Sequence, residues 1–379
     1  MKNMKNIVKP LAVFSTAALL MCASGCGDTS WSFKTDDDTI SNGTYIYYTY
    51  MAYNEASSKI EEEASAAEES SDTAESSASS TESEVSEESV DILTQKIEDK
   101  TAEEWIADKA KEECIAQLTM DKLIKEHNVE VDEEEIEIYT SYYEQYYQYG
   151  SSFYTELGIS KESYLNATGR YTGLSEQLFY SIYDKGGSKE VPSEDIEKYF
   201  TENYINYFCI PYSLKTTDDD GNKTDIDDET MDKVKTNFAK YADMLNKGSS
   251  TDDVVEKYKT DFEVTDDPSQ SDNIIVEDSG MGDEFKKVIN GLKEKEATVT
   301  SIDDTYYLIY KGAIKDQVST LSDDSTQMNQ RTEVLHKMKD DEFKKYLDDE
   351  EAKLKYETND ACLSRYSVKS TVDKINSMS

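Results

Sequence analysis

Apolar residues recur with the spacing of an α-helix along much of the first two hundred residues. The clearest run, from Ile106 to Leu118, places an apolar side chain at every fourth position and therefore on one helical face. Similar spacing follows Thr44, Asp132 and Ser160. The sequence therefore predicts that residues 44–204 form an all-helical domain.

The pattern changes after residue 204. Short runs rich in β-branched and aromatic residues alternate with helical segments, an order typical of a small α+β domain. The expected elements are a strand at 205–214, helices at 229–246 and 254–258, a strand at 274–276, a helix at 281–292 and a strand at 306–310. We therefore predict an α+β fold that is mostly α, with the α+β domain over 205–315. Residues 316–379 are expected to form C-terminal helices.

One predicted helix carries five tyrosines on a single face. With helical spacing, Ile136 is followed on that face by Tyr139, Tyr142, Tyr143, Tyr146 and Tyr147. One interpretation is a face packed into the core, because stripes with this spacing usually point inward. The other is a half-exposed, polypeptide-binding surface, because a tyrosine hydroxyl needs water or a partner and rigid rings bury much area at low entropy cost. The sequence leaves both interpretations open.

Composition and charge narrow the range of functions. The 379 residues include 81 acidic and 40 basic side chains, which gives a net charge of −41, and 11% of them are aromatic. The aromatic content excludes a fully disordered chain. The acidic excess excludes a nucleic-acid binder, because phosphates need a basic surface, and favours neutral or basic partners. Residues 61–90 contain only Glu, Asp, Ser, Thr, Ala and two Val. Because such a segment can bury little apolar surface, it is predicted to be a disordered acidic insert.

The N-terminus has the pattern of a secretory signal. Three lysines precede an apolar run from Leu11 to Met21, and the small residues Ala23–Gly25 then lead to Cys26. This succession resembles a bacterial lipobox, in which the cysteine is acylated and becomes the mature N-terminus. We expect residues 1–25 to be removed and Cys26 to be lipidated. Residues 26–43 are then expected to be a polar tether on the outer face of the cell membrane.

Two alternatives to lipidation at Cys26 remain at this stage. Cys22 is a competing lipidation site, although the bulky Met21 before it fits cleavage poorly. An ordinary signal peptide with release of the protein would show the same apolar run and small residues.

The chain offers few residues for metal, cofactor or acid–base chemistry. The three cysteines after Cys26 are widely spaced, and we expect small buried side chains rather than a disulfide or a nucleophile. The two histidines, His127 and His336, leave little room for histidine-based metal sites or catalytic triads. The acidic run 218–227 departs from the calcium-loop pattern and predicts a hairpin turn. No catalytic residue, metal ligand or cofactor is predicted.

Three sequence segments and the lipobox occur in an order that is similar to that of one family. The segments are Leu118–Tyr139, Glu190–Tyr204 and Phe285–Gly312, and the lipobox at Cys26 is similar to that of Gram-positive foldases. In this order the chain resembles the SurA/PrsA-type extracytoplasmic foldases. The resemblance implies a helical chaperone domain similar to those of SurA and trigger factor. It also implies a parvulin-like peptidyl-prolyl isomerase domain and C-terminal helices that return to the helical domain.

The catalytic motifs of that family are not matched. Its isomerases resemble each other in a histidine of the first strand, where this chain has Tyr207–Ile210, and in one of the last strand, where it has Tyr307. Their glycine-rich turn is replaced by Thr265–Pro268. Met281 and Phe285 match the Met and Phe that line the family's prolyl pocket, although ordinary helix packing would also use such residues.

The residues and the resemblance together predict a membrane-anchored, extracytoplasmic chaperone. Its partners would be unfolded or newly secreted polypeptides, and its isomerase activity would be lost. The first alternative is an active peptidyl-prolyl isomerase, against which the two missing histidines count. The second is a surface scaffold or a solute-binding lipoprotein. A solute receptor would need alternating strands and helices in two lobes, which the helical first half does not provide.

Overall fold

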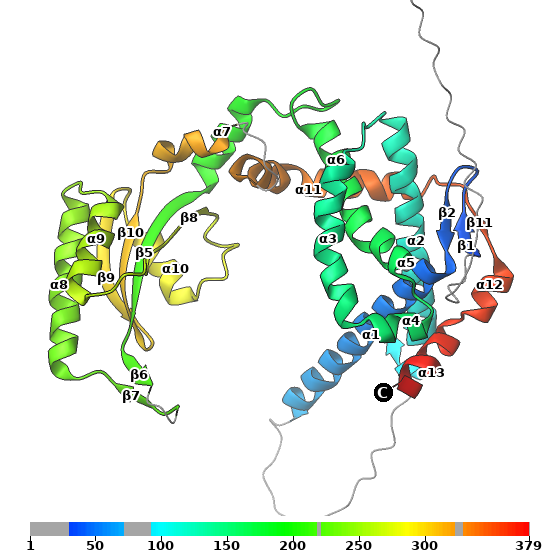
Figure 1. Ribbon diagram of the computed structural model, residues 1–379, viewed down its shortest axis with the longest axis horizontal. Coiled ribbons are helices and arrows are strands. Elements are labelled where there is room, and N and C mark those ends of the chain that lie inside the picture. The colour runs from blue at the N-terminus through cyan, green and yellow to red at the C-terminus, as the bar shows by residue number, and fades with distance from the viewer. Residues whose placement is uncertain (1–29, 72–91, 218–220, 323–328, 379) are drawn as a thin grey trace, which may run out of the picture. The chain divides into compact units, whose positions relative to one another are not determined.

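The protein forms two compact units that are mostly helical and carry small antiparallel sheets. The computed structural model describes residues 30–71, 92–217, 221–322 and 329–378 (Figure 1). The first unit combines the described residues up to Leu123 with 131–174 and 353–378, and the second combines 124–130 with 175–352. The predicted fold class, α+β with a majority of helix, is confirmed.

The division between the units falls inside two helices. Both α2 (Ala102–Glu126) and α6 (Tyr171–Tyr183) begin in the first unit and end in the second. The units therefore do not divide at residue 204, because the end of α6 packs with α11 (Gln330–Glu351). The C-terminal region is divided as well, since α11 belongs to the second unit and residues from Lys353 onward belong to the first.

The first unit is built mainly from helices that begin or end in it. In chain order its elements are β1 (Trp31–Lys34), β2 (Thr39–Ser41), α1 (Asn42–Ser71), η1 (Ile92–Thr94), β3 (Lys96–Ile97), β4 (Lys100–Thr101), α2, α3 (Glu133–Tyr149), α4 (Ser151–Leu157), α5 (Lys161–Leu165), the π-helical turn η2 (Asn166–Arg170), the start of α6, β11 (Glu357–Thr358), α12 (Asp360–Arg365) and α13 (Val368–Met378).

A small sheet takes the place of part of the predicted tether. Residues 26–43 were expected to be a polar linker, but β1 pairs antiparallel with β2 and with β11, in the order β11-β1-β2. Phe33 and Ile40 are buried in this sheet and belong to the core of the unit. An acidic turn, Asp36–Asp38, separates these two apolar residues, so the average composition of the segment hides its strand pattern.

Helix α1 extends further than the sequence suggested. Residues 61–71, which were assigned to the disordered insert, continue the helix. The remainder of the insert, 72–90, lies outside the described residues. Alanine and glutamate have high helix propensity, so they extend a helix whose earlier turns already pack, even though they have little apolar surface to bury. The prediction of disorder is therefore wrong for residues 61–71.

Helices α1, α2 and α13 share the core of the first unit. The predicted α2 face is confirmed, because its apolar side chains from Ile106 to Leu118 are fully buried. On α13, Val368 and Val372 pack into the same cluster as Ala52 and Ala56 of α1. The expected burial of the three described cysteines is also confirmed. None of the helices in the described ranges combines the length and the hydropathy needed to cross a bilayer.

The second unit contains a four-stranded sheet and its flanking helices. In chain order its elements are the end of α6, α7 (Ser193–Asn203), β5 (Ile205–Ser213), β6 (Lys215–Thr217), β7 (Lys223–Asp225), α8 (Asp228–Asn246), α9 (Thr251–Phe262), β8 (Gln270–Ile274), α10 (Asp283–Gly291), β9 (Glu296–Ile302), β10 (Thr305–Lys311), η3 (Ile314–Leu321) and α11.

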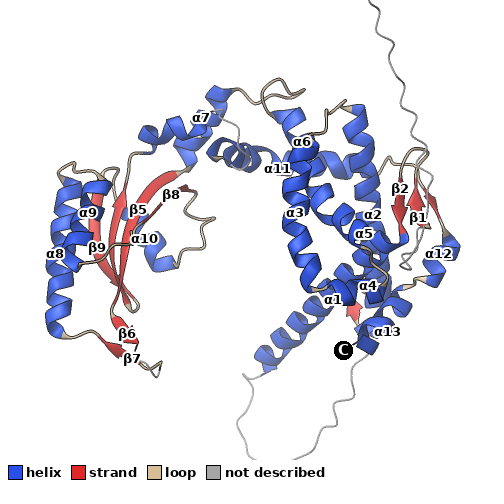
Figure 2. Ribbon diagram, viewed as in Figure 1, coloured by secondary structure: helices blue, strands red, loops and turns tan. Residues whose placement is uncertain are grey.

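The sheet of the second unit is antiparallel, with the strand order β8-β5-β10-β9, and helices cover both of its faces (Figure 2). On the face covered by α8 and α9, Phe238 packs against Ile210 and Leu308. On the opposite face, Ile289 of α10 packs against Ile309. Successive strand residues point to opposite faces, so each central strand supplies apolar side chains to both layers.

Two features of this sheet bear on the sequence prediction: a proline inside β5 and an additional strand, β9. Pro211 is tolerated inside β5 because pairing with β8 ends at Cys209, so the strand has a partner on one side only at that point. Strand β9 was not predicted, since its sequence mixes polar and apolar residues. It forms by pairing with β10 through a tight turn in which Asp303 has a φ of 49°.

The strands on either side of residues 218–220, which lie outside the described residues, pair as the predicted hairpin requires. Strands β6 and β7 pair antiparallel, with Lys215 opposite Asp225. Asp227, the last acid of the run, caps α8 by accepting a hydrogen bond of 2.7 Å from the backbone N–H of Thr230. Its carboxylate therefore stabilises a helix terminus, which explains an acid at this position without a bound cation.

Candidate functional site

Helix α3 holds the five tyrosines that the sequence singled out. The helix begins after Asp132, whose side chain accepts hydrogen bonds from the backbone N–H groups of Glu134 and Glu135. This cap and the three acids of the first turn stabilise the positive end of the helix dipole. The five tyrosines span about 140° around the axis, since each residue advances about 100°. That arc is too wide for one contact surface, so the helix divides into an inner and an outer face.

The inner face belongs to the core, as one of the two interpretations proposed. Tyr147 is buried, and its ring stacks on Tyr154 with centroids 5.4 Å apart. Its hydroxyl donates a hydrogen bond of 3.4 Å to the carbonyl oxygen of Ile159. Tyr143 is half-buried against the same cluster. Tyr139 is half-buried against Gly173, where an added Cβ would lie 3.2 Å from its ring.

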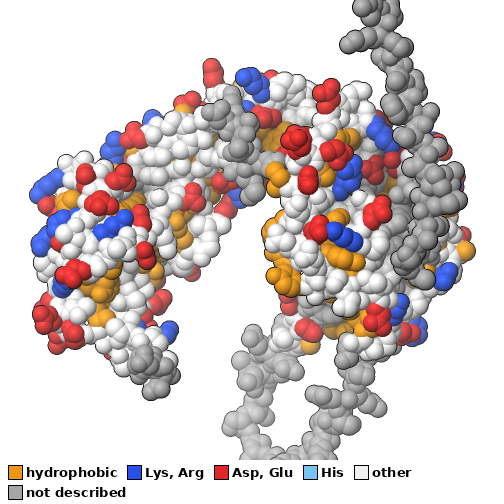
Figure 3. All heavy atoms as spheres, viewed as in Figure 1, with side chains coloured by type: hydrophobic (Ala, Val, Ile, Leu, Met, Phe, Trp, Pro, Cys, Tyr) orange, Lys and Arg blue, Asp and Glu red, His pale blue; other side chains and the backbone are white. Residues whose placement is uncertain are grey.

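The outer face of α3 consists of four exposed apolar or aromatic side chains. They are Ile138 at 57% exposure, Tyr142 at 55%, Tyr146 at 51% and Tyr149 at 90%. They follow one another at helical spacing, and Figure 3 shows hydrophobic side chains gathered where Figure 1 places α3. Six large hydrophobic side chains are exposed in the described residues, and these are four of them. An exposed patch of this kind is typical of an interaction surface.

Sequence reasoning identified only half of the outer face. Tyr142 and Tyr146 were among the five tyrosines, but Ile138 and Tyr149 were not. The spacing of Ile138, Tyr142, Tyr146 and Tyr149 follows the helical period, so it could have been recognised as a second stripe. What the sequence could not show is which of the two stripes the neighbouring helices leave uncovered.

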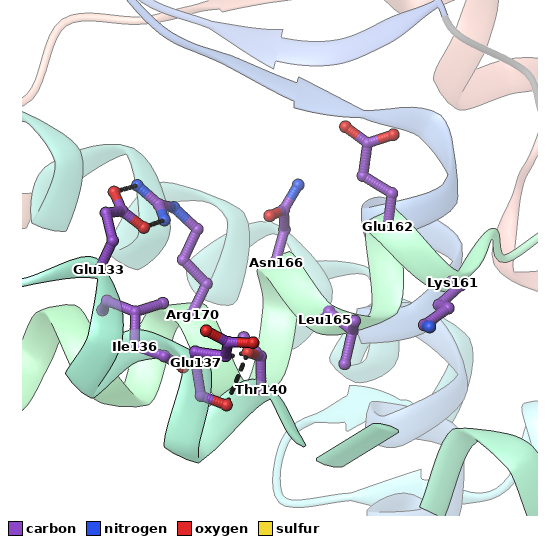
Figure 4. Close-up of a pocket in the computed structure, with 9 residues that line it drawn as sticks. All are labelled: Glu133, Ile136, Glu137, Thr140, Lys161, Glu162, Leu165, Asn166 and Arg170. Carbon is purple, nitrogen blue, oxygen red and sulfur yellow. Dashed lines mark hydrogen bonds and ion pairs between the residues drawn. The ribbon is translucent and has the colours of Figure 1, made fainter. Parts of the chain in front are cut away.

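A pocket of about 540 Å³ lies beside α3, on the side away from the outer face (Figure 4). Ile136 and Leu165 supply its apolar surface. On its rim, the guanidinium of Arg170 donates to Glu133 at 3.0 Å and 3.4 Å, and Lys161 donates to Glu144 at 2.5 Å. Both cations are thus engaged by carboxylates. Since Glu137 and Glu162 also line the pocket, it combines an apolar wall with an acidic rim.

The π-helical turn η2 brings the pocket wall close to α3. A Cβ added at Gly169 would lie 2.6 Å from the Cα of Thr140, so only glycine allows this approach. The hydroxyl of Thr140 donates to the backbone oxygens of Ile136 and Glu137, at 3.1 Å and 3.2 Å. The close approach sets the position of α3 against η2, and with it the side of the helix that remains exposed.

A second aromatic group lies on the α10 face of the sheet. Phe285 of α10 contacts Tyr207 of β5 and Tyr307 of β10, with ring centroids 6.3 Å and 5.5 Å apart. The fold therefore brings Tyr307 and one end of the segment Tyr207–Ile210, within which the resemblance implied a histidine, to the same side chain of α10. Phe285 is only 8% exposed, and Met281 is partly buried in the same cluster. In this arrangement Phe285 serves the packing of α10 on the sheet.

The groups near Phe285 are poorly suited to proton transfer. Burial raises the pKa of the Cys209 thiol to about 11, so the thiolate is scarcely populated at neutral pH. Burial also raises the pKa of Tyr207 above its usual value of 10.0. In the described ranges, no three His, Cys, Asp or Glu side chains converge as ligands of a metal ion.

Sequence reasoning missed a polar cluster around His336 on α11. The imidazole stacks on Phe179 of α6, with ring centroids 4.0 Å apart and planes 9° apart. Its Nε2 lies 3.1 Å from Glu176 and 3.3 Å from the hydroxyl of Tyr180, and its Nδ1 lies 2.7 Å from Asp340. This cluster joins two helices of the second unit.

Comparisons with known proteins found only distant likenesses. No family model and no curated protein matches the chain. Two similar solved structures are PrsA from Bacillus subtilis and foldase protein PrsA from Streptococcus pneumoniae. The first is 17% identical, covering 68% of this chain and 89% of that chain, with a TM-score of 0.31. The second is 18% identical, covering 72% and 97%, with a TM-score of 0.33. TM-scores this low carry no argument about fold or function.

Proposed function

We propose that the protein is an extracytoplasmic, foldase-type chaperone that binds unfolded polypeptide segments on the outer face of α3. The single observation that carries the proposal is the outer face itself, where three tyrosines and an isoleucine are exposed together on one helix. Rigid aromatic side chains bury a large area at a low entropy cost, and they therefore suit the binding of varied sequences. The packed inner face and the close approach of η2 hold this surface in place.

The location of the protein is part of this proposal. The succession of lysines, apolar residues and small residues before Cys26 supports lipidation at that cysteine. A lipid at Cys26 would hold the chaperone at the outer face of the cell membrane, where newly secreted polypeptides emerge. Cys26 lies outside the described residues, so this part of the proposal rests on the sequence pattern alone.

The α+β region 205–315 is proposed to be a degenerate, parvulin-like isomerase domain. The segment Tyr207–Ile210 of the first strand and Tyr307 of the last strand stand where active relatives would carry histidines, and Phe285 contacts the rings of Tyr207 and Tyr307. Rotation about an X–Pro bond faces a barrier of about 18–20 kcal/mol. The Cys209 thiol and the Tyr207 phenol, whose pKa values burial raises, are not poised to lower this barrier by proton transfer near neutral pH. The domain would then contribute binding surface or spacing.

Both activities can be measured on one preparation of the purified protein. We expect it to suppress aggregation of a chemically unfolded client on dilution and to catalyse isomerisation of a proline-containing peptide poorly. Replacing all four outer-face residues by serine should remove most of the protection. The matched control replaces the two other exposed hydrophobic residues, Met51→Ser and Val264→Ser, and should protect like the original protein.

Three outcomes would contradict the proposal. Full protection by the four-serine variant would show that the outer face does not bind clients. Failure of the unaltered, folded protein to protect any client would favour the scaffold alternative. Efficient proline isomerisation that is lost with Met281→Ala would contradict the degenerate-domain assignment.

A further inference from the structure

The charged side chains of α3, the helix that carries the outer face, are all negative. The 17 residues of α3 include five glutamates and neither lysine nor arginine. The whole chain has a net charge of −41, so the long-range field also attracts cations to this face. Arg170 and Lys161 pair with Glu133 and Glu144 on the pocket side of α3. The helix itself supplies no cation to the exposed aromatic surface, which the net charge of the chain places in a negative potential.

The exposed rings have the chemistry that binds cations. A lysine or arginine group is attracted to the face of an aromatic ring within about 6 Å of its centroid. Elsewhere in the molecule the chain's own lysines use this contact. Lys111 lies 5.8 Å from the ring centroid of Tyr356, and Lys189 lies 5.6 Å from that of Tyr346. Among the described residues, no cation of the chain is placed over a ring of the outer face.

The arrangement of the rings favours an extended partner. Tyr142 and Tyr146 meet edge to face, with centroids 5.0 Å apart and planes at 65°, and their hydroxyls are 2.9 Å apart. One hydroxyl donates to the other, and the remaining hydroxyl hydrogen is left for water or for an acceptor on the ligand. Ile138 and Tyr149 extend the surface by about one turn at either end, which corresponds to an α-helical length of about 16 Å from Ile138 to Tyr149. A segment of about five extended residues spans this length.

We infer that the outer face of α3 selects polypeptide segments that combine apolar residues with lysine or arginine, whose cationic groups bind over the tyrosine rings. The inference rests on the proposed function and names the class of client that the same surface prefers. Aliphatic stems of these side chains would lie along Ile138 and the ring edges while their charged ends face the rings and the glutamates. Each engaged ring is expected to contribute about two- to five-fold in affinity.

The test compares isosteric peptides on the purified full protein. The probes are two fluorescein-labelled, unstructured 12-residue peptides of Leu, Gly and Ser with four arginines in one and four citrullines in the other. Citrulline keeps the shape of arginine and removes its charge. Binding is measured by fluorescence anisotropy in 0.1 M and in 1 M NaCl, since the higher salt shortens the screening length from about 10 Å to about 3 Å. We expect at least about five-fold tighter binding of the arginine peptide, with part of the preference retained in 1 M NaCl.

Two triple variants separate ring contacts from apolar contacts and from general charge. Replacing Tyr142, Tyr146 and Tyr149 by phenylalanine keeps the rings and should keep the preference for arginine. Replacing the same three residues by leucine keeps an apolar surface and should abolish the preference in 1 M NaCl while the citrulline peptide still binds. The three side chains are exposed, so neither change should unfold the helix, which circular dichroism checks.

The possible failures are distinguishable. If the unaltered protein binds both peptides equally, the inference is wrong and the proposed function stands. If it binds neither peptide and protects no client, the proposed function fails as well. If the leucine variant retains the full preference for arginine in 1 M NaCl, the cations are not held by the rings, and the inference is again wrong.

Discussion

His336 should make the stability of the second unit depend on pH. We consider His336→Phe, which keeps a ring stacked on Phe179 but removes the groups that meet Glu176 and Asp340. Burial of the imidazole by itself would lower its pKa. Hydrogen bonds and the negative charges of Glu176 and Asp340 outweigh burial, and the pKa is raised above 6.5. The geometry agrees, because both ring nitrogens face a carboxylate, so the doubly protonated ring satisfies both.

The sign of the effect follows from the direction of this shift. Because the folded pKa lies above the unfolded value near 6.5, the charged imidazole contributes its full stabilisation below that value. The contribution is lost as the pH rises through the raised folded pKa. The His336 side chain is 26% exposed and Asp340 is 63% exposed, so solvent screens much of the Asp340 interaction. We therefore assign about 1–2 kcal/mol to the pH-dependent part, most of it from the less exposed Glu176.

Differential scanning calorimetry at pH 5.5 and pH 8.5 measures this difference. For a domain of 150–250 residues, 1 kcal/mol moves the midpoint by about 2–4 °C, so the deficit of His336→Phe should be about 2–8 °C larger at pH 5.5. His127→Phe is the matched control, since Nε2 of His127 lies 2.8 Å from the hydroxyl of Tyr346 rather than from a carboxylate. With only two histidines in the chain, proton NMR can also follow His336 directly. An equal deficit at both pH values, or a titration midpoint below 6.5, would refute the reasoning.

Two further predictions concern the core of the second unit and the membrane anchor. Phe285→Ala should destabilise the second unit by about 3–5 kcal/mol, because it removes a buried ring that contacts Tyr207 and Tyr307. Phe285→Leu should destabilise it less, and urea unfolding measures both variants. A loss of stability below about 1 kcal/mol for the alanine variant would contradict the observed packing. Cys26→Ser should release the protein from isolated membranes, whereas Cys22→Ser should leave it bound. Fractionation and immunoblotting measure both variants. The reverse pattern would identify Cys22 as the lipidated residue.

Features that depend on local periodicity could be predicted from the sequence. The buried face of α2 from Ile106 to Leu118, the strand at 306–310 and the hairpin after β6 all follow from spacing or turn chemistry within a few residues. The acidic excess, from which we predict that nucleic acid is not a partner, is a property of composition alone. The structures of residues 26–43 and 61–71 were harder to predict. Average composition conceals both a short strand such as β1 and the continuation of α1.

The candidate site depended on contacts between distant segments. A helical stripe of tyrosines specifies which residues share a side of α3, but the burial of that side is decided by the neighbours that pack on it, which include α4, α5 and η2. Those neighbours cover Tyr147 and leave Tyr142 exposed, although both tyrosines belong to the same helical stripe in the sequence. In the same way, pairing of β5 with β10 and the packing of α10 bring Tyr207 and Tyr307 to Phe285. Periodicity in a sequence defines the faces of an element, whereas the tertiary structure determines which of those faces remains in contact with water.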